Sequence, residues 1–143
     1  MTPFIANDTR LSAVRRMLQA PDRRTRGGSL IHISSQMGHV GSPNRTVYCM
    51  TKHAVEGLTK ALALELAPQG IRVLSIAPTF IETPLFKQMA ESSGFADWVR
   101  GRIAMGRVGE VEEVAAAVVF AASPAASLMT GSSLLVDGGW TAQ

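Results

Sequence analysis

The chain has 143 residues, of which 46% are hydrophobic and 17% are charged, and its formal net charge is +3. This balance is typical of one globular domain and excludes an intrinsically disordered chain. The single cysteine, Cys49, excludes an intramolecular disulfide, and no apolar run reaches the ~18 residues that a membrane span needs. Since there is no apolar leader near Met1 and no metal-ligand spacing among the histidines, we expect a cytoplasmic protein without a metal site or membrane contact.

The positive charge is concentrated near the start of the sequence, in Arg10, Arg15, Arg16, Arg23, Arg24 and Arg26. A basic cluster of this kind raises the possibility of a nucleic-acid patch or a transit peptide. However, Asp8 and Asp22 interrupt the cluster, and Phe4 is the one aromatic residue beside it. We therefore favour a solvated helix face and expect no nucleic-acid partner.

The sequence predicts helices and strands in alternation. Apolar residues recur at helical spacing over Thr9 to Gln19, Thr46 to Ala67 and Glu110 to Pro124. Short β-rich runs predict strands over Ser29 to Ser34, Ile71 to Ile76 and Leu134 to Val136. This order predicts a parallel sheet with helices on its faces, which is a partial doubly wound, Rossmann-like α/β fold with three strands.

Two finer expectations concern the segments around the sheet. The pattern in the central helix predicts a buried face made of Ala54, Leu58, Ala61, Leu62 and Leu66. Pro78 and Pro84 bracket a predicted loop. The polar segment over residues 91–107 is predicted to be a mobile lid, with Phe95 and Trp98 available for packing.

The start of the central helix contains the strongest candidate for chemistry. Tyr48 and Lys52 are four residues apart, which places both on one helix face, one turn from each other. A positive charge at that distance favours the phenolate, so Tyr48 could exchange a proton with a substrate oxygen. Ser35 follows a predicted strand, at the carboxyl end of the sheet where ligands of such folds bind, and its hydroxyl could hold the same oxygen. Taken alone, a Tyr and a Lys at this spacing are more often surface residues.

Several ordered motifs accompany this pair. They are Ile33-Ser34-Ser35, Tyr48 with Lys52, Ala77-Pro78, Ile81-Glu82-Thr83-Pro84, Gly106-Arg107-Val108-Gly109, Phe120-Ala121-Ala122-Ser123, Thr130-Gly131 and Val136-Asp137-Gly138-Gly139. With these motifs the chain resembles the short-chain dehydrogenase/reductase family, in the branch of 3-oxoacyl-carrier-protein reductases and sugar or gluconate dehydrogenases. The resemblance covers about Gly27 to Trp140.

The resemblance implies roles for the matching residues. Tyr48 would be the general acid/base, Lys52 would support its ionisation and bind the nicotinamide ribose, and Ser35 would hold the substrate oxygen. Pro78, Thr79, Ile81 and Thr83 would form the loop at the nicotinamide end of NAD or NADP. Asn7 stands where the family often has an asparagine that supports the lysine through water, although its neighbours Ala6, Asp8 and Arg10 match poorly and a helix N-cap or loop asparagine is the favoured explanation. The implied reaction is hydride transfer between the cofactor and a carbonyl or alcohol, without a metal.

The front of the family's cofactor fold has no counterpart in this sequence. Gly27-Gly28 precedes a strand, whereas the glycine-rich turn that binds a pyrophosphate follows one. We therefore expect residues 1–143 to be a single truncated domain without the glycine-rich, dinucleotide-binding half. Two functions follow: an NAD(P)-dependent oxidoreductase, or a catalytically inactive fragment that acts as an oligomerisation module. Members of the family commonly form homo-oligomers through the long helix and the last strand and helix.

Overall fold

The computed structural model describes residues 9–20, 22, 27–91 and 94–143, and the sheet is its central layer. Three parallel strands, β1 (Gly28–Ile33), β2 (Ile71–Pro78) and β3 (Ser133–Val136), lie in the order β1-β2-β3. Gly28 lies opposite Ile71, and Ile76 lies between Ile33 and Leu134 in the register. The predicted α/β fold with a three-stranded parallel sheet is therefore confirmed.

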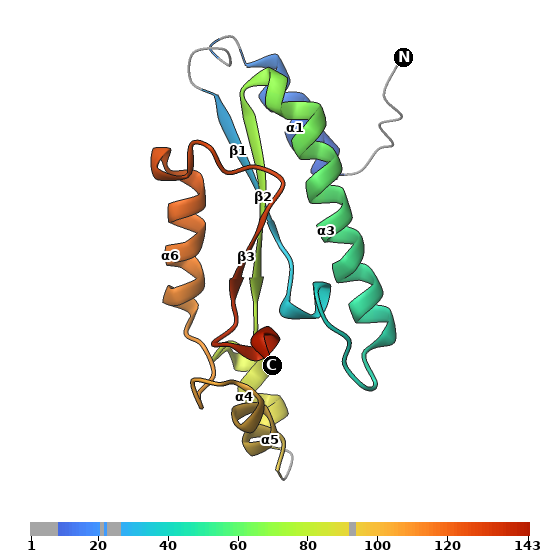
Figure 1. Cartoon of the computed structure of the whole chain (residues 1–143), viewed down its shortest axis with the longest axis vertical. Helices are drawn as coiled ribbons and strands as arrows, with labels where there is room; N and C mark the ends of the chain where they lie inside the picture. The colour runs from blue at the N-terminus through green and yellow to red at the C-terminus, as the bar shows by residue number, and fades with distance from the viewer. Residues whose placement is uncertain (1–8, 21, 23–26, 92–93) are drawn as a thin grey trace.

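Helices cover both faces of this sheet and one of its ends. Helices α1 (Thr9–Gln19) and α3 (Thr46–Leu66) lie on one face, and α6 (Val111–Ala122) lies on the other (Figure 1). Two shorter helices, α4 (Pro84–Ala90) and α5 (Phe95–Arg102), lie at the end where the strands terminate. Among the described helices, none has the length and apolarity to cross a membrane.

The central strand β2 supplies the core on both faces because successive side chains of a strand point in opposite directions. Ile71 and Val73 pack against Leu62 and Leu66 of α3. The alternate residues Leu74 and Ile76 pack on the other face, with Ala121 of α6. This double coverage explains why the sequence of β2 is apolar at nearly every position.

The buried face of α3 differs from the predicted one. Leu62 and Leu66 are buried as expected, but Ala54 and Ala61 are exposed. Glu56 and Thr59 are buried instead, with 6% and 1% of their surface exposed. Both polar side chains have partners, since Glu56 accepts a hydrogen bond from Ser75 and Thr59 is hydrogen-bonded to His32.

The predicted loop between Pro78 and Pro84 is confirmed, because β2 ends at Pro78 and α4 begins at Pro84. The segment that follows this loop is more ordered than the predicted lid. It forms α4 and α5, and α4 begins with a Thr83 side chain that accepts a hydrogen bond from the backbone N–H of Phe86. Thr followed by Pro is a strong helix start, and the prediction overlooked this signal for a helix after the loop. The aromatic residues of this segment join Phe80 and Trp140 in one cluster, made of Phe80, Phe86, Phe95, Trp98 and Trp140.

Candidate active site

A pocket of about 450 Å³ opens at the carboxyl ends of β1 and β2. This is the end of a parallel sheet at which ligands of doubly wound folds bind. The residues predicted from the sequence and described by the structure all line it: Ser35, Tyr48, Lys52, Pro78, Thr79, Ile81 and Thr83. The other predicted residue, Asn7, lies outside the described residues. Segments that are far apart in the sequence thus meet around one cavity.

Ser35 begins the short 3-10 turn Gln36–Gly38 that follows β1. Its Oγ accepts a hydrogen bond from the backbone N–H of Met37 at 3.2 Å and donates one to Oε1 of Gln36 at 2.8 Å. The preceding residue anchors the turn to the sheet, because the N–H of Ser34 donates to the carbonyl of Ile76 at 2.7 Å. Ser35 is 5% exposed, so its hydroxyl is held in one place at the edge of the pocket.

Tyr48 and Lys52 lie on successive turns at the start of α3. The Lys52 ammonium lies 5.5 Å from the centre of the Tyr48 ring and donates to the carbonyl of Ile33 at 3.2 Å. Ile33 is the last residue of β1, so the ammonium connects the helix to the strand that leads to Ser35. Tyr48 itself is 45% exposed and lines the pocket, so its phenol is accessible to a ligand.

The loop after β2 forms the opposite wall and is held by the segment that leads into α6. Gly109 donates to the carbonyl of Phe80 at 2.9 Å and accepts from the N–H of Glu82 at 2.8 Å. A side chain at position 109 would place its Cβ 2.7 Å from Cδ1 of Ile81. A larger residue at the last position of the Gly106-Arg107-Val108-Gly109 motif would therefore require the Ile81 side chain to move.

One hydroxyl in this loop has an unused hydrogen-bonding capacity. Oγ1 of Thr79 is buried and has no partner among the described residues, although the backbone N–H of Thr79 donates to Val136. A buried polar group without a partner is costly in free energy, and ligand-binding sites are where such groups occur. Thr79 and Lys52 line the same pocket.

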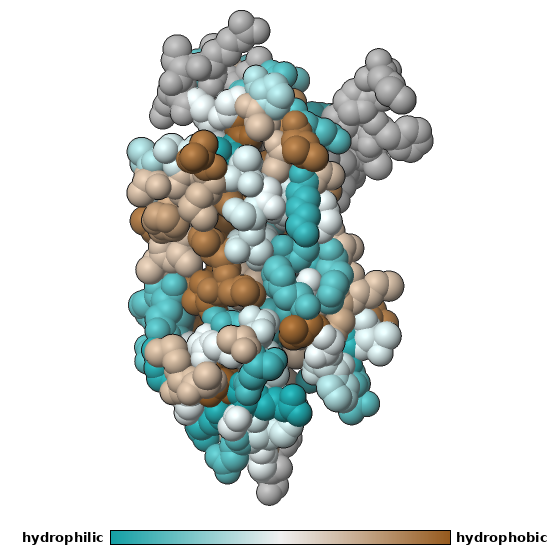
Figure 2. Space-filling model, viewed as in Figure 1, coloured by the Kyte–Doolittle hydropathy of each residue, from teal (hydrophilic) through white to brown (hydrophobic). Residues whose placement is uncertain are grey.

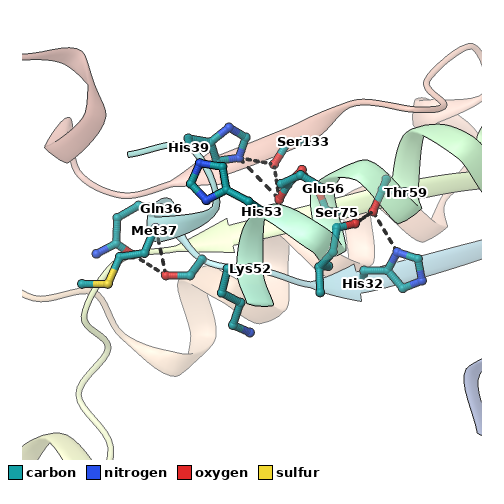
Figure 3. A network of polar contacts seen from close by, with 12 residues as sticks. His32, Gln36, Met37, His39, Lys52, His53, Glu56, Thr59, Ser75 and Ser133 are labelled. Carbon is teal, nitrogen blue, oxygen red and sulfur yellow. Dashed lines mark hydrogen bonds and ion pairs between the residues drawn. The ribbon is translucent and has the colours of Figure 1, made fainter. Parts of the chain in front are cut away.

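A buried polar network fixes the walls relative to one another (Figure 3). The carboxylate of Glu56 on α3 accepts from the hydroxyl of Ser75 on β2 at 2.8 Å and from that of Ser133 on β3 at 3.4 Å. His39, just after the Ser35 turn, places Nε2 at 3.0 Å from Ser133 Oγ and 3.4 Å from Oε1 of Glu56. Glu56 therefore joins the helix of Tyr48 and Lys52 to two strands and to the loop that follows Ser35.

Sequence reasoning missed several residues of this site. Gln36 engages the hydroxyl of Ser35, Glu56 anchors the helix, and Arg45 lines the pocket. The sequence did contain two signals for these residues: Gln36 is a polar residue directly after Ser35, and Glu56 is a carboxylate four residues after Lys52. The apolar wall contributed by Phe80, Leu85, Phe86 and Met89 could not be recognised without the position of α4.

Chemically, the pocket can bind an oxygen atom and exchange a proton with it. Its lining includes the phenol of Tyr48, the ammonium of Lys52, the guanidinium of Arg45, and serine and threonine residues such as Ser35 and Thr79, beside several apolar side chains. Within the described parts of the chain, no group of three or more His, Cys, Asp or Glu residues is placed to hold a metal ion.

Comparisons with known proteins agree on one family. A family model described as enoyl-(acyl carrier protein) reductase matches residues 6–141. The short-chain dehydrogenase fogB of Aspergillus ruber is 40% identical over 124 residues, which are 86% of this chain and 45% of that protein. The 3-oxoacyl-[acyl-carrier-protein] reductase FabG of Thermotoga maritima is 41% identical over 116 residues, which are 81% of this chain and 46% of that protein.

A solved structure extends the comparison to the fold. The gluconate 5-dehydrogenase of Burkholderia cenocepacia, in complex with NADP and tartrate, has a TM-score of 0.84 and 34% identity. The alignment covers 93% of this chain and 50% of that one. This chain thus spans about half the length of the proteins that it matches.

Proposed function

Because this chain belongs to the short-chain dehydrogenase/reductase family, we propose that it serves in hydride transfer between NAD(P) and a carbonyl or alcohol substrate. The observation that carries the proposal is the meeting of Ser35, Tyr48 and Lys52 around one pocket. We also propose that residues 1–143 form a single domain, equivalent to the carboxyl-terminal half of a complete family member.

The proposed mechanism assigns the proton transfer to Tyr48. As a substrate carbonyl is reduced, the phenol donates its proton to the developing alkoxide, and in the oxidation of an alcohol the phenolate removes it. The ammonium of Lys52 lies 5.5 Å from the centre of the Tyr48 ring. Ser35 holds the same substrate oxygen. To do so, its hydroxyl turns away from Gln36 and donates its hydrogen bond to the substrate. A bound nicotinamide would supply or accept the hydride.

The proposed cofactor-binding residues are Tyr48 and Lys52 on α3 and Pro78, Thr79, Ile81 and Thr83 on the facing loop. The unpartnered hydroxyl of Thr79 supports this assignment, because a carboxamide would satisfy it. The hydroxyl of Thr83 caps α4 by accepting from Phe86, which leaves its proton available for a ligand. NAD and NADP both fit these contacts, since the groups that distinguish them bind far from the nicotinamide.

The decisive experiment replaces Tyr48 with Phe, which keeps the ring and removes the proton. We expect turnover of NADPH or NADH with a carbonyl substrate to fall by about 10²–10⁴-fold, the usual contribution of a general acid or base. Cys49→Ser is the matched control, because Cys49 neighbours Tyr48 on α3 without lining the pocket. A Tyr48→Phe variant that keeps most of its rate would contradict the mechanism.

We also propose that the protein forms homo-oligomers through its exposed apolar faces. Val47, Met50 and Leu64 of α3 are 69%, 64% and 80% exposed, and Val119 and Leu128 on the opposite side are 68% and 97% exposed. Figure 2 shows apolar residues gathered over α6 and beside β3. Exposed apolar surface of this kind commonly marks an interaction site.

Sedimentation of the purified chain tests this proposal, with Leu64→Ser and Leu128→Ser reporting on the two faces separately. We expect one variant or both to shift the chain toward the monomer. A monomeric wild type would contradict it. Stable oligomers combined with no binding of NADH or NADPH would instead favour the association module over the oxidoreductase.

The proposed location is the cytoplasm, where a nicotinamide-dependent enzyme meets its cofactor pool. The free thiol of Cys49 is compatible with a reducing compartment. Fractionation of cells that produce the protein, with an antibody against the chain, would test this.

A further inference from the structure

The charged groups around the pocket have one sign. Among the described residues that line it, Arg45 and Lys52 are the only charged ones, and there is no aspartate or glutamate. A wall without carboxylates and with two cations produces a positive potential in the cavity. Such a potential favours an anionic ligand over a neutral one.

The two cations differ in the number of contacts that their charged groups already make within the protein. The ammonium of Lys52 donates to the carbonyl of Ile33 and lies beside the Tyr48 ring. The guanidinium of Arg45 is exposed and pairs with no carboxylate among the described residues. Its backbone is nevertheless fixed, because its N–H donates to Ser42 and its carbonyl accepts from Cys49. Arg45 thus presents a free charge from a fixed position.

Arg45 is also placed correctly relative to the candidate catalytic residues. It immediately precedes α3, three residues before Tyr48, so the two side chains lie one helical turn apart at the rim of the same pocket. Phe80, Phe86 and Met89 give the same pocket an apolar wall, so the two cations are the charged groups that a ligand meets there among the described lining residues. The planar guanidinium offers two parallel N–H donors, the arrangement that matches a carboxylate.

From these observations we propose that the pocket selects oxo or hydroxy acids, with the carboxylate bound by Arg45 and the reacting oxygen held at Tyr48 and Ser35. This inference rests on the proposed function, because it assigns the substrate class of the same pocket. Arg45 is a specificity residue in this arrangement and takes no part in proton transfer. A neutral ketone of the same shape binds more weakly, since it leaves the guanidinium without a partner.

The test compares a keto acid with its neutral ester on the full chain, without cofactor. The probes are 4-oxopentanoate and methyl 4-oxopentanoate, which present the same ketone with and without a negative charge. Binding is followed by NMR of ¹³C-labelled methionine methyl groups, because Met37 and Met89 both line the pocket. These signals report on the cavity and do not require turnover.

We expect the acid to bind at least about 10-fold more tightly than the ester, because one charge-assisted bidentate contact increases affinity by about this factor. Arg45→Gln should abolish the difference by weakening the acid alone, and Arg45→Lys should retain part of it. Arg16→Gln is the matched control, because it removes an equal charge from an exposed position on α1. The preference should also shrink in high salt, which screens the ion pair.

Two results would overturn the inference, and they differ in what they say about the proposed function. Equal affinities for acid and ester, unaffected by Arg45→Gln, would contradict the selection of acids and leave the carbonyl site intact. If neither ketone shifts Met37 or Met89, the pocket is not a carbonyl site at all, and both proposals are wrong.

Discussion

At the scale of single residues, the ability of Ser35 to bind a substrate oxygen depends on which group accepts its hydroxyl proton. The hydroxyl of Ser35 has one proton and donates it to Gln36, while its oxygen accepts from Met37. Binding a substrate oxygen therefore requires an exchange of partners, and Gln36 is the residue that must release the proton. Gln36 lines the pocket and is 2% exposed, so this exchange takes place among buried groups.

A second residue with a defined electrostatic environment is Glu113, in the first turn of α6. The guanidinium of Arg107 binds its two oxygens at 2.7 Å and 2.9 Å, and the backbone N–H of Glu110 adds a third hydrogen bond. These contacts, with the Arg107 hydrogen bonds as the largest cause, lower the pKa of Glu113 from 4.5 to about 2. The ion pair between Arg107 and Glu113 also connects the segment before α6 to the first turn of that helix.

This lowered pKa predicts how acid affects stability. A carboxylate whose folded pKa is lowered stabilises the protein above its unfolded pKa, and this contribution is lost as the pH falls from about 4.5 toward about 2. We expect Glu113→Gln to melt at a lower temperature than wild type at pH 6, with the difference shrinking toward pH 3. Glu112→Gln, in the same exposed helix turn but outside the contact with Arg107, is the control. A pH-independent difference would contradict the assignment.

At the scale of elements, the sequence predicts the strands and the longer helices, because local periodicity defines them. The three strands and the three longer helices were predicted within a few residues of their observed ends, because apolar spacing and turn residues determine them. The convergence of Ser35, Tyr48 and Lys52 also followed from local rules, since parallel strands end on one side of a sheet. Local rules did not predict which face of α3 is buried, because the partners of Glu56 and Thr59 lie on β1 and β2 and are distant in sequence.

The same limit explains why α4 and α5 were missed. Each is only seven or eight residues long, so its apolar residues at helical spacing, such as Phe86 and Ala90 or Phe95 and Val99, span little more than one turn. They pack into a shared cluster with Phe80 and Trp140. A pattern within one segment cannot reveal a core that several segments build together. The apolar wall of the pocket, which belongs to this region, was therefore beyond sequence reasoning.

The buried carboxylate of Glu56 gives a prediction at this scale. Glu56→Leu would leave Ser75, Ser133 and His39 without their acceptor, and we expect it to lower the free energy of unfolding by about 2–4 kcal/mol. Glu56→Gln keeps an acceptor oxygen and should cost only about 1 kcal/mol. Urea unfolding measures both, with the exposed Glu65→Gln of the same helix as control. A Glu56→Leu variant as stable as wild type would show that the network contributes nothing.

At the scale of the whole molecule, the hydrophobic residues form separate cores. One lies between the sheet and α1 with α3, another lies between the sheet and α6, and the third contains Phe86, Val99, Ile103 and Trp140. The third core is built mainly from short helices and loops at the carboxyl end of the sheet, beside the pocket. A substrate that enters the pocket touches this core directly, through Phe86.

Both tryptophans of the chain belong to the aromatic cluster at this end of the molecule, Trp140 within the third core and Trp98 at its exposed edge. Trp98 and Trp140 lie 5.9 Å apart in an edge-to-face arrangement, so their emission is governed by this one region. Far-ultraviolet circular dichroism, by contrast, reports mostly on the longer helices α3 and α6. The protein therefore contains a natural optical reporter of its pocket end. Fluorescence should lose its native signal at or below the temperature at which the dichroism does, and a cluster that outlasts the helices would mean that the pocket end is the more stable part.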